Sequence, residues 1–357
     1  MTTRRAIEIE APGAARVVTE ELRDPAPGEL LVTSEWGALS LGSEGLAFRG
    51  GLPSDLRLDD TAGALNASAG YPMRYGYILS GRVSAVGAGV DAAEWLGKRV
   101  FAFHPHASAA CVPATEVLVV PPETDPSVVP LYANTETALS LHWDAAILPG
   151  ESVAVLGCGI VGLLVLGMSL RGAAAAVAVV EPDPVRREWA ASYAAVTSSE
   201  SQGRVAFFDG VAAARRWLET RPGAYAGLYR GADCTFDLTG APPALDSAIE
   251  ITAFGGRVVM GSWYGNQPVT AALGGRFHRS RIQLVSSQVS TVPLGVAGRI
   301  DRERRTRMVW DILPRLAAEH LPRRTVGLAG IPEVYRRVRD GVSVEPWVAV
   351  DYAQQEE

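Results

Sequence analysis

A run of glycines near the middle of the chain has the spacing of a nucleotide-binding turn. Residues 157–162 read Gly-Cys-Gly-Ile-Val-Gly and directly follow the apolar stretch 153–156, and Glu181 stands further on. In such a run the first glycine permits a tight turn, the second admits a pyrophosphate, and the third lets the next helix pack closely. An acid ending the following strand can bind adenosine ribose hydroxyls. The pattern predicts a dinucleotide site, against the alternative of helix-packing glycines and a chance acid.

The segments around this turn alternate between strand-like and helical patterns. Residues 152–156 and 176–181 are short apolar runs typical of buried strands, and 184–195 has helical periodicity after Pro184. The same alternation continues over 233–238, 243–253, 257–261 and 282–286. Alternating β and α units predict a doubly wound parallel sheet, with the glycine turn at the carboxyl end of a strand.

The first third of the chain has a different texture. Short alternating apolar runs, broken by glycine and proline, occur at 30–34, 81–86, 99–103 and 116–120. They predict a mostly antiparallel β domain. Residues 50–72 show little periodicity and predict a long surface loop. We therefore expect a β domain over 1–134, a dinucleotide-binding domain over 135–290, and a C-terminal segment over 291–357 that returns to the first domain.

Composition limits the class of protein. The chain has 357 residues, enough for two domains, and 48% of them are hydrophobic. Its net charge is −6 and it has no basic block, so nucleic acid is not an expected partner. Cys111, Cys158 and Cys234 lie far apart, which favours a reducing compartment over a disulfide framework. Glycines and Arg171 interrupt the most apolar stretch, 160–180, and no signal segment is evident, so we expect a soluble cytoplasmic protein without a membrane partner.

Several motifs resemble the medium-chain dehydrogenase/reductase superfamily. Residues 81–90 read Gly-Arg-Val-Ser-Ala-Val-Gly-Ala-Gly-Val, which is similar to the GxVxxVGxGV stretch of that superfamily. The texture is nearest to a zinc-free branch resembling bacteriochlorophyllide a dehydrogenase, at 40–44, 100–106, 263–265, 277–279 and 286–289. The resemblance spans about residues 20–350. It implies an α/β fold made of a GroES-like β domain and a Rossmann domain, a nicotinamide cofactor, and oxidoreductase activity on a small-molecule substrate.

The same resemblance shows where this chain departs from the zinc-dependent members. Those members carry zinc-ligating residues at three positions that here hold Leu41, Tyr77 and Ala133. Leucine and alanine cannot ligate zinc, and tyrosine is a poor ligand beside histidine or a cysteine thiolate. The four-cysteine lobe that holds a structural zinc in that superfamily is also missing. We therefore predict no metal site.

Without zinc, side chains must polarise the substrate oxygen and exchange its proton. By the resemblance, Tyr77 occupies a vacated ligand position, His106 lies where the chain crosses the substrate cleft, and Ser43 matches a hydroxyl that relays a proton towards the nicotinamide ribose. Since imidazole titrates nearest neutral pH, we predict that His106 exchanges the proton while Tyr77 orients the oxygen. Each residue also has a structural alternative. Tyr77 could be a pocket wall, His106 a hydrogen-bonded structural histidine, and Ser43 a turn residue. We expect Glu44 to form a buried ion pair.

The resemblance also assigns the remaining positions of the site. The predicted cofactor-binding residues are Gly157, Gly159, Ile160, Val161, Gly162, Glu181, Arg186, Gly261, Ser262, Ser287 and Gln288. Asn134 adjoins the lost third ligand, and it either hydrogen-bonds a substrate oxygen or caps a helix. Trp263 and Tyr264 either wall the substrate pocket or form a partly buried aromatic pair.

Three functions fit these residues. The favoured one is a dehydrogenase that moves a hydride between NAD(H) and a secondary alcohol or ketone of a medium-to-large metabolite. The alternatives are a zinc-free quinone or enone reductase using NADPH, and a dinucleotide-binding protein that has lost catalysis. Glu181 favours NAD over NADP, because its charge would repel a 2′-phosphate. The strand-like run 282–285 has the character of a sheet edge, which in this superfamily predicts a homodimer.

Overall fold

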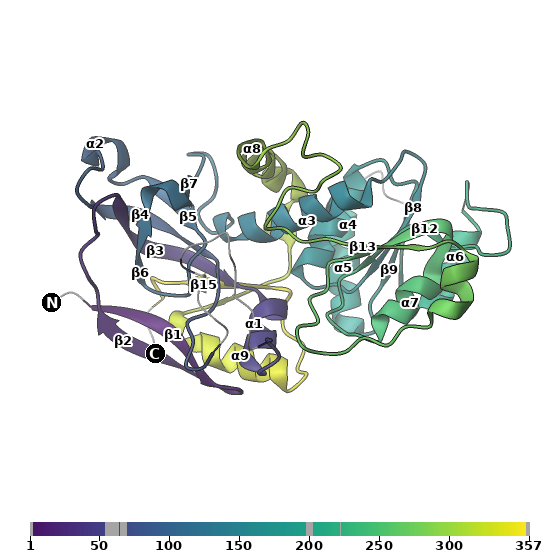
Figure 1. The fold of residues 1–357 in the computed structure, drawn as a ribbon, viewed down its shortest axis with the longest axis horizontal. Helices are drawn as coiled ribbons and strands as arrows, with labels where there is room; N and C mark the ends of the chain where they lie inside the picture. The colour runs from purple at the N-terminus through teal and green to yellow at the C-terminus, as the bar shows by residue number, and fades with distance from the viewer. Residues whose placement is uncertain (1–2, 54–63, 65–69, 198–202, 222, 355–357) are drawn as a thin grey trace. The chain divides into compact units, whose positions relative to one another are not determined.

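The computed structural model describes residues 3–53, 64, 70–197, 203–221 and 223–354. They form two compact units, Met1–Leu131 with Arg323–Glu357, and Tyr132–Pro322 (Figure 1). The expected boundaries were 134 and 290, and the second differs by a whole helix. Helix α8 (Arg302–Ile312) packs against α3 (Tyr132–Ala145), so the chain re-enters the first unit only after Pro322. Most of the predicted 50–72 loop lies outside the described residues.

A seven-stranded sheet forms the centre of the first unit. Its strands run in the order β14-β15-β3-β4-β5-β7, and β6 pairs with β3. The bounds are β3 Glu29–Leu39, β4 Leu79–Val86, β5 Arg99–Ala102, β6 Ala109–Pro113, β7 Val117–Val119, β14 Arg323–Val326 and β15 Trp347–Asp351. Strand β15 pairs antiparallel with β3, so the C-terminal segment completes the sheet begun by the N-terminal residues.

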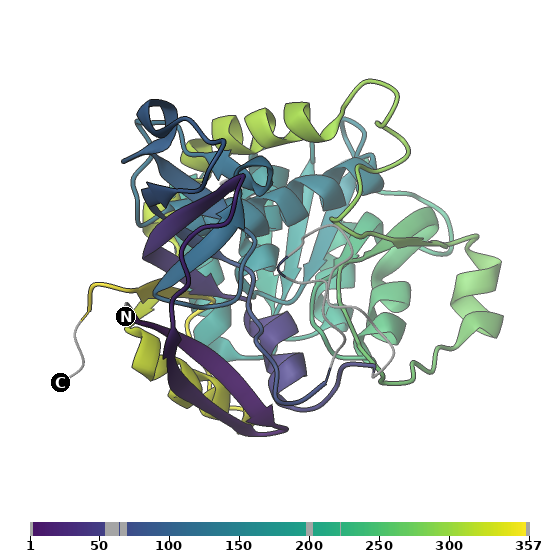
Figure 2. The same cartoon turned by 60° about the vertical axis from the view of Figure 1, so that its left-hand side comes forward.

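A separate hairpin, β1–β2, covers part of this unit and packs with two helices. The bounds are β1 Thr3–Ala11, β2 Ala14–Glu21, α1 Leu41–Phe48 and α9 Ile331–Arg339. Ile7 and Ile9 of β1 are fully buried in one core with Leu46 of α1 and with Ile331 and Val334 of α9. Figure 2 shows the hairpin beside α9. This core fixes α1, the helix that carries Ser43 and Glu44.

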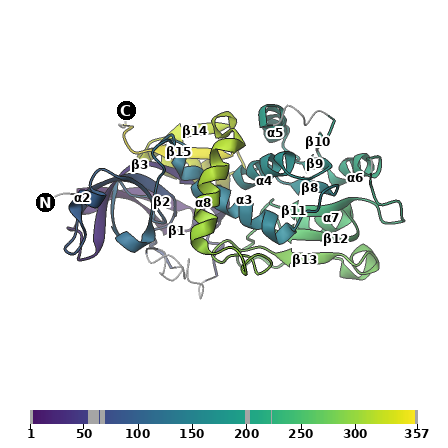
Figure 3. The same ribbon diagram turned by 90° about the horizontal axis from the view of Figure 1, so that it is seen from above.

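The second unit contains the predicted doubly wound sheet, so the α/β fold class is confirmed. Six parallel strands run in the order β10-β9-β8-β11-β12-β13, a sequence that Figure 3 shows from edge to edge. The strands are β8 Ser152–Leu156, β9 Ala176–Val180, β10 Val205–Phe208, β11 Ala232–Asp237, β12 Thr252–Met260 and β13 Gln283–Ser286. The other helices are α4 Ile160–Arg171, α5 Pro184–Thr197, α6 Val211–Glu219 and α7 Ala244–Ile251.

The order of the strands reverses between β8 and β11. From β8 the chain builds outward to β9 and β10 on one side, and then returns to build β11, β12 and β13 on the other. In open α/β sheets, ligands bind in the crevice at the carboxyl ends of the strands where the order reverses in this way. The glycine run follows β8, so it lies at this point.

Among the described residues, no helix is both long enough and apolar enough to cross a bilayer. The apolar helix α4 is buried along most of its length in the second unit.

Candidate functional site

The glycine run forms a tight turn into α4. Gly157 has φ +94°, and an added Cβ there would lie 2.8 Å from the carbonyl oxygen of Leu238. A Cβ at Gly162 would lie 2.0 Å from the carbonyl oxygen of Gly157, so both positions require glycine. At Gly159, by contrast, a Cβ would meet no atom within 4 Å, because the site opens there.

Gly159 is also the N-cap residue of α4, and it has no side chain with which to cap the helix. The amides of Ile160, Val161 and Gly162 in the first turn therefore point out of the helix without a capping oxygen from that residue. Such amides, at the positive end of the helix dipole, form a ready site for a phosphate.

Glu181 directly follows β9 and is almost fully buried against the glycine turn. Its Oε2 accepts a hydrogen bond from the amide of Cys158 at 2.9 Å, and its Oε1 accepts one from the amide of Asp183 at 3.1 Å. Arg187 donates to the carbonyl oxygen of Glu181 at 2.6 Å, while the amide of Arg186 bonds Asp183 at 3.2 Å. The structure thus brings the predicted acid into contact with the glycine turn, through the amide of Cys158.

A buried carboxylate that sequence reasoning missed organises the next part of the site. Asp237 ends β11 and is fully buried. Its Oδ1 accepts hydrogen bonds from the Thr239 hydroxyl at 2.8 Å and from the Ser262 hydroxyl at 3.1 Å, and its Oδ2 accepts one from the Tyr264 hydroxyl. Its carbonyl oxygen also accepts the amides of Gly261 and Ser262. The sequence did contain a signal for Asp237, because an acid at the carboxyl end of a predicted parallel strand lies at the edge where ligands bind.

The two aromatic residues of the predicted pocket have different surroundings. Trp263 is 39% exposed, whereas Tyr264 is buried and donates its hydroxyl to Asp237. Burial, reinforced by the Asp237 carboxylate, raises the pKa of Tyr264 well above its usual value. Tyr264 is therefore held as a neutral donor, and Trp263 is the one of the pair that is open to a ligand.

Ser287 and Gln288 follow β13. The amide of Ser287 bonds the carbonyl oxygen of Met260 at 3.2 Å, and its hydroxyl donates to Asp144 at 2.7 Å. The Gln288 side chain bonds both the hydroxyl and the amide of Ser290. Asn134, a third candidate in this unit, is buried inside the first turn of α3 rather than at its N-cap, so the capping alternative is wrong.

In the first unit, Tyr77 has a partner that the sequence did not indicate. Its hydroxyl donates to the hydroxyl of Ser40 at 2.5 Å. The amide of Ser40 in turn donates to Oε1 of Glu44 at 2.8 Å. Ser43 lies in the same helix and is partly exposed. The structure therefore joins Tyr77 to Ser40, one turn before the serine that was predicted.

His106 does not lie open in a cleft. Its side chain is fully buried, and its Nε2 lies 3.1 Å from Oε2 of Glu44. That oxygen also accepts the hydroxyl of Tyr335 at 2.6 Å, and Nδ1 of His106 has no hydrogen-bond partner among the described residues. This enclosure favours the structural alternative over the predicted proton exchange, because a substrate oxygen cannot reach a fully buried ring. Glu44 forms the buried pair that was expected of it.

No three His, Cys, Asp or Glu residues in the described part of the chain lie together as a possible metal site. The three cysteines are all free thiols. Leu41 begins α1 and Ala133 lies in α3, so two of the three ligand positions present only hydrocarbon.

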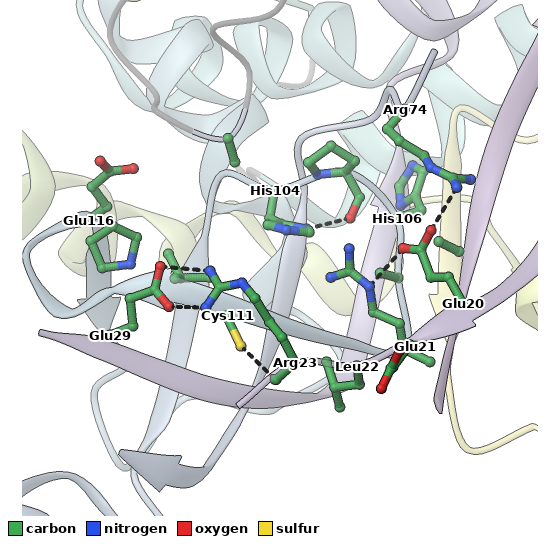
Figure 4. Close-up of a pocket in the computed structure, with 17 residues that line it drawn as sticks. Glu20, Glu21, Leu22, Arg23, Glu29, Arg74, His104, His106, Cys111 and Glu116 are labelled. Atoms are coloured by element: carbon green, nitrogen blue, oxygen red, sulfur yellow. Dashed lines mark hydrogen bonds and ion pairs between the residues drawn. The ribbon is translucent and has the colours of Figure 1, made fainter. Parts of the chain in front are cut away.

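A cavity of about 640 Å³ lies elsewhere in the first unit (Figure 4). His104 lines it, and Glu20 there accepts Arg74 at 2.7 Å and Arg4 at 2.8 Å. Burial lowers the pKa of His104 to about 4. Of the predicted site residues only His106 borders the cavity, and its side chain has no exposed surface there. The arginines of the cavity are already paired with carboxylates, so we do not assign the substrate to it.

Comparison with known proteins finds several relatives with sequence similarity, and two of them are described here. No protein-family profile matches the chain. The chain is 28% identical over 278 residues to (R,R)-butanediol dehydrogenase of Bacillus subtilis (strain 168), covering 68% of this chain and 72% of that protein. It is 34% identical over 138 residues to "Probable D-xylulose reductase A" of Aspergillus terreus (strain NIH 2624), but the match spans only 38% of this chain and 36% of that relative.

Among solved structures, 2R,3R-butanediol dehydrogenase from Bacillus subtilis has the same fold, with a TM-score of 0.73 and 20% identity. The superposition covers 98% of this chain and 99% of that one. The predicted combination of a GroES-like β domain with a Rossmann domain is therefore confirmed.

Proposed function

We propose that this chain, a homologue of the medium-chain alcohol dehydrogenases, transfers a hydride between NAD(H) and a secondary alcohol or ketone. One observation carries the proposal: the open N-terminus of α4 and the carboxylate of Glu181 lie together where the order of the parallel strands reverses. Phosphates bind such helix ends, and ribose hydroxyls bind such carboxylates. The relative with the longer match is named for oxidising a diol, which is a secondary alcohol.

The chain's residues fit an NAD molecule. The amides of Ile160, Val161 and Gly162 would bind the pyrophosphate, and Glu181 the adenosine ribose. Bound in this way, NAD⁺ would supply the hydride acceptor. Arg187 uses one guanidinium nitrogen on backbone carbonyls, and this supports NAD over NADP, because an arginine engaged with the backbone offsets less of the repulsion between Glu181 and a 2′-phosphate.

Zinc does not fit the three positions at which zinc-dependent members of the superfamily bind it. Leu41 and Ala133 offer no ligand atom, and the hydroxyl of Tyr77 is 2.5 Å from Ser40. We therefore propose a zinc-independent reaction, and this chain's own hydroxyls must polarise the substrate oxygen.

We propose that Tyr77 supplies the hydroxyl for this step. It is half-buried, and a substrate oxygen could compete with Ser40 for its proton. A neutral tyrosine, with a pKa of about 10, is a donor at neutral pH and suits the polarisation of a carbonyl. Ser40 both donates and accepts, so it is the next hydroxyl on a proton path from Tyr77. Ser43 stays a proposed relay, and His106 supports Ser40 indirectly through Glu44.

Several finer assignments belong to the same proposal. We propose that Gly261, Ser262, Ser287 and Gln288 surround the nicotinamide, and that Trp263 and Asn134 wall the substrate pocket. The resemblance to the zinc-free branch supports a medium-to-large substrate. A cytoplasmic location and a homodimer complete the proposal.

A substrate panel tests it. The purified chain should reduce NAD⁺ with at least one secondary alcohol, and should use NADP⁺ less well. Faster reduction of quinones or enones with NADPH would instead support a quinone or enone reductase. Tight binding of NADH with no turnover of any panel member would indicate a dinucleotide-binding protein without catalysis.

A further inference from the structure

Arg305 is the largest fully buried side chain in the described part of the chain. It lies in α8, which packs beside α3 within the second unit (Figures 1 and 3). Removing a guanidinium from water costs several kcal/mol, so the structure must compensate its charge and its hydrogen-bonding groups. The groups that pair with this guanidinium therefore indicate the role of Arg305.

One partner is a carboxylate on the neighbouring helix. Nη2 of Arg305 lies 2.9 Å from Oε1 of Glu136, which is buried in α3. The hydroxyl of Tyr132 lies 3.4 Å from the same carboxylate oxygen and also donates to Thr306 at 3.1 Å. Burial raises the pKa of Glu136 even beside Arg305, as expected for a pair enclosed by protein.

The other partners are carbonyl oxygens of the loop that follows β13. Nη1 of Arg305 donates to Val289 at 2.8 Å and to Thr291 at 3.2 Å. These residues directly follow Ser287 and Gln288, which are proposed to contact the nicotinamide. Arg305 thus ties the loop over 287–291 to a fixed point between two helices.

We propose that Arg305, held by Glu136, is a positioning residue that pre-orders the 287–291 loop for the nicotinamide half of the dinucleotide. The inference rests on the proposed function. Neither side chain has to touch the cofactor, because the guanidinium acts through the carbonyl groups of Val289 and Thr291. A loop that is already ordered does not spend binding free energy on becoming ordered.

The test compares two ligands that share the adenosine half. NADH has a nicotinamide and ADP-ribose does not, so loss of the anchor should weaken NADH and leave ADP-ribose unchanged. The variant is the double substitution Arg305→Met with Glu136→Gln, which removes both charges and leaves no unpaired ion in the interior. We expect the dissociation constant of NADH to rise roughly tenfold, the gain expected from immobilising one or two groups in advance. The dissociation constant of ADP-ribose should stay within twofold.

Arg307→Ala is the matched control, because Arg307 lies on the same helix but pairs with Glu303 at the surface. It should change neither constant. Arg305→Lys keeps the charge but cannot reach three acceptors with a planar fork, so it should give an intermediate NADH affinity. Hydrogen exchange of the amides at 288–291 should accelerate in the double variant, which measures the loss of order without a ligand.

The binding results distinguish a failure of the positioning role of Arg305 from a failure of the proposed function. If the unmodified chain binds neither NADH nor ADP-ribose, the proposed function fails. If the unmodified chain binds both, and the folded double variant also binds NADH normally or loses NADH and ADP-ribose affinity equally, the positioning role is wrong. Should the double variant not fold, Arg305→Lys decides the matter by the same comparison.

Discussion

Tyr77 and His106 have different surroundings within the first unit. Tyr77 is half-buried with its hydroxyl on Ser40, whereas His106 is enclosed with Glu44 and Tyr335. The sequence could not supply this distinction, because Tyr335 lies 291 positions from Glu44 and no local pattern links them. The pairing arises only when α9 packs on α1.

The two residues should therefore respond differently to substitution. Tyr77→Phe should lower turnover about a hundredfold or more and leave NADH affinity unchanged, since it removes one polarising hydroxyl. His106→Asn should instead lower the free energy of unfolding by about 3 kcal/mol, because it removes one partner of a buried pair. Steady-state kinetics and chemical denaturation of both variants check this. A stable His106→Asn protein without turnover would return the catalytic role to His106.

Glu181 allows a prediction about cofactor choice. Its carboxylate holds the amide of Cys158 and is proposed to bind the ribose hydroxyls. Glu181→Gln keeps a hydrogen-bond acceptor but removes the negative charge, so the preference for NADH over NADPH should narrow, mostly through tighter NADPH binding. Fluorescence titration with both cofactors measures the ratio. An unchanged ratio would mean that the charge at this position does not select the cofactor.

At the scale of elements, local patterns predicted most of the parallel sheet. Strands β8, β9, β11 and β13 lie close to the ranges expected from their apolar runs, because fully buried strands need continuous apolar sequence. Strand β10 was missed, since its four residues are only half-buried at the sheet edge. Helix α6 was missed although Ala214 and Leu218 are buried at helical spacing, a signal that was available. The C-terminal boundary depended on the packing of α8 and was not visible locally.

The packing of α3 on α4 leads to a pH prediction. Nδ1 of His142 bonds the carbonyl oxygen of Ala138 at 2.9 Å, and its Nε2 lies 3.2 Å from the hydroxyl of Ser169. The ring of His142 is partly buried, and both of its nitrogens face protein groups. These surroundings suit a neutral imidazole. Burial lowers the pKa of His142 from 6.5 to about 4.

Proton binding by the unfolded chain sets the direction in which stability changes with pH. Between these two values the unfolded chain binds a proton at His142 and the folded chain does not, so stability falls as the pH is lowered through this window. From pH 7 to about pH 5 the loss should be about 1 to 2 kcal/mol. His142→Gln should flatten this part of the stability profile. His320→Gln, at a histidine that is 53% exposed, should not. Equal slopes in all three proteins would contradict the assignment.

At the scale of the whole molecule, β13 is the outer strand of the parallel sheet and Leu284 on it is exposed. We expect two such edges to pair in a homodimer. Leu284→Lys should shift the protein towards monomer, because a lysine on an edge strand opposes pairing. Val342→Lys, at an exposed valine of the first unit, is the control. Light scattering at micromolar concentration reports the mass, and a monomeric unmodified chain would exclude the dimer.

We expect this chain to oxidise a secondary alcohol with NAD⁺ and without zinc. The most direct measurement is the rate of NADH formation by protein that has been dialysed against a chelator and analysed for metals in the same sample. We predict well under one zinc ion per chain and an undiminished rate, because Leu41, Tyr77 and Ala133 replace the three ligands. Stoichiometric zinc whose removal abolishes NADH formation, and whose return restores it, would show that the reaction depends on zinc.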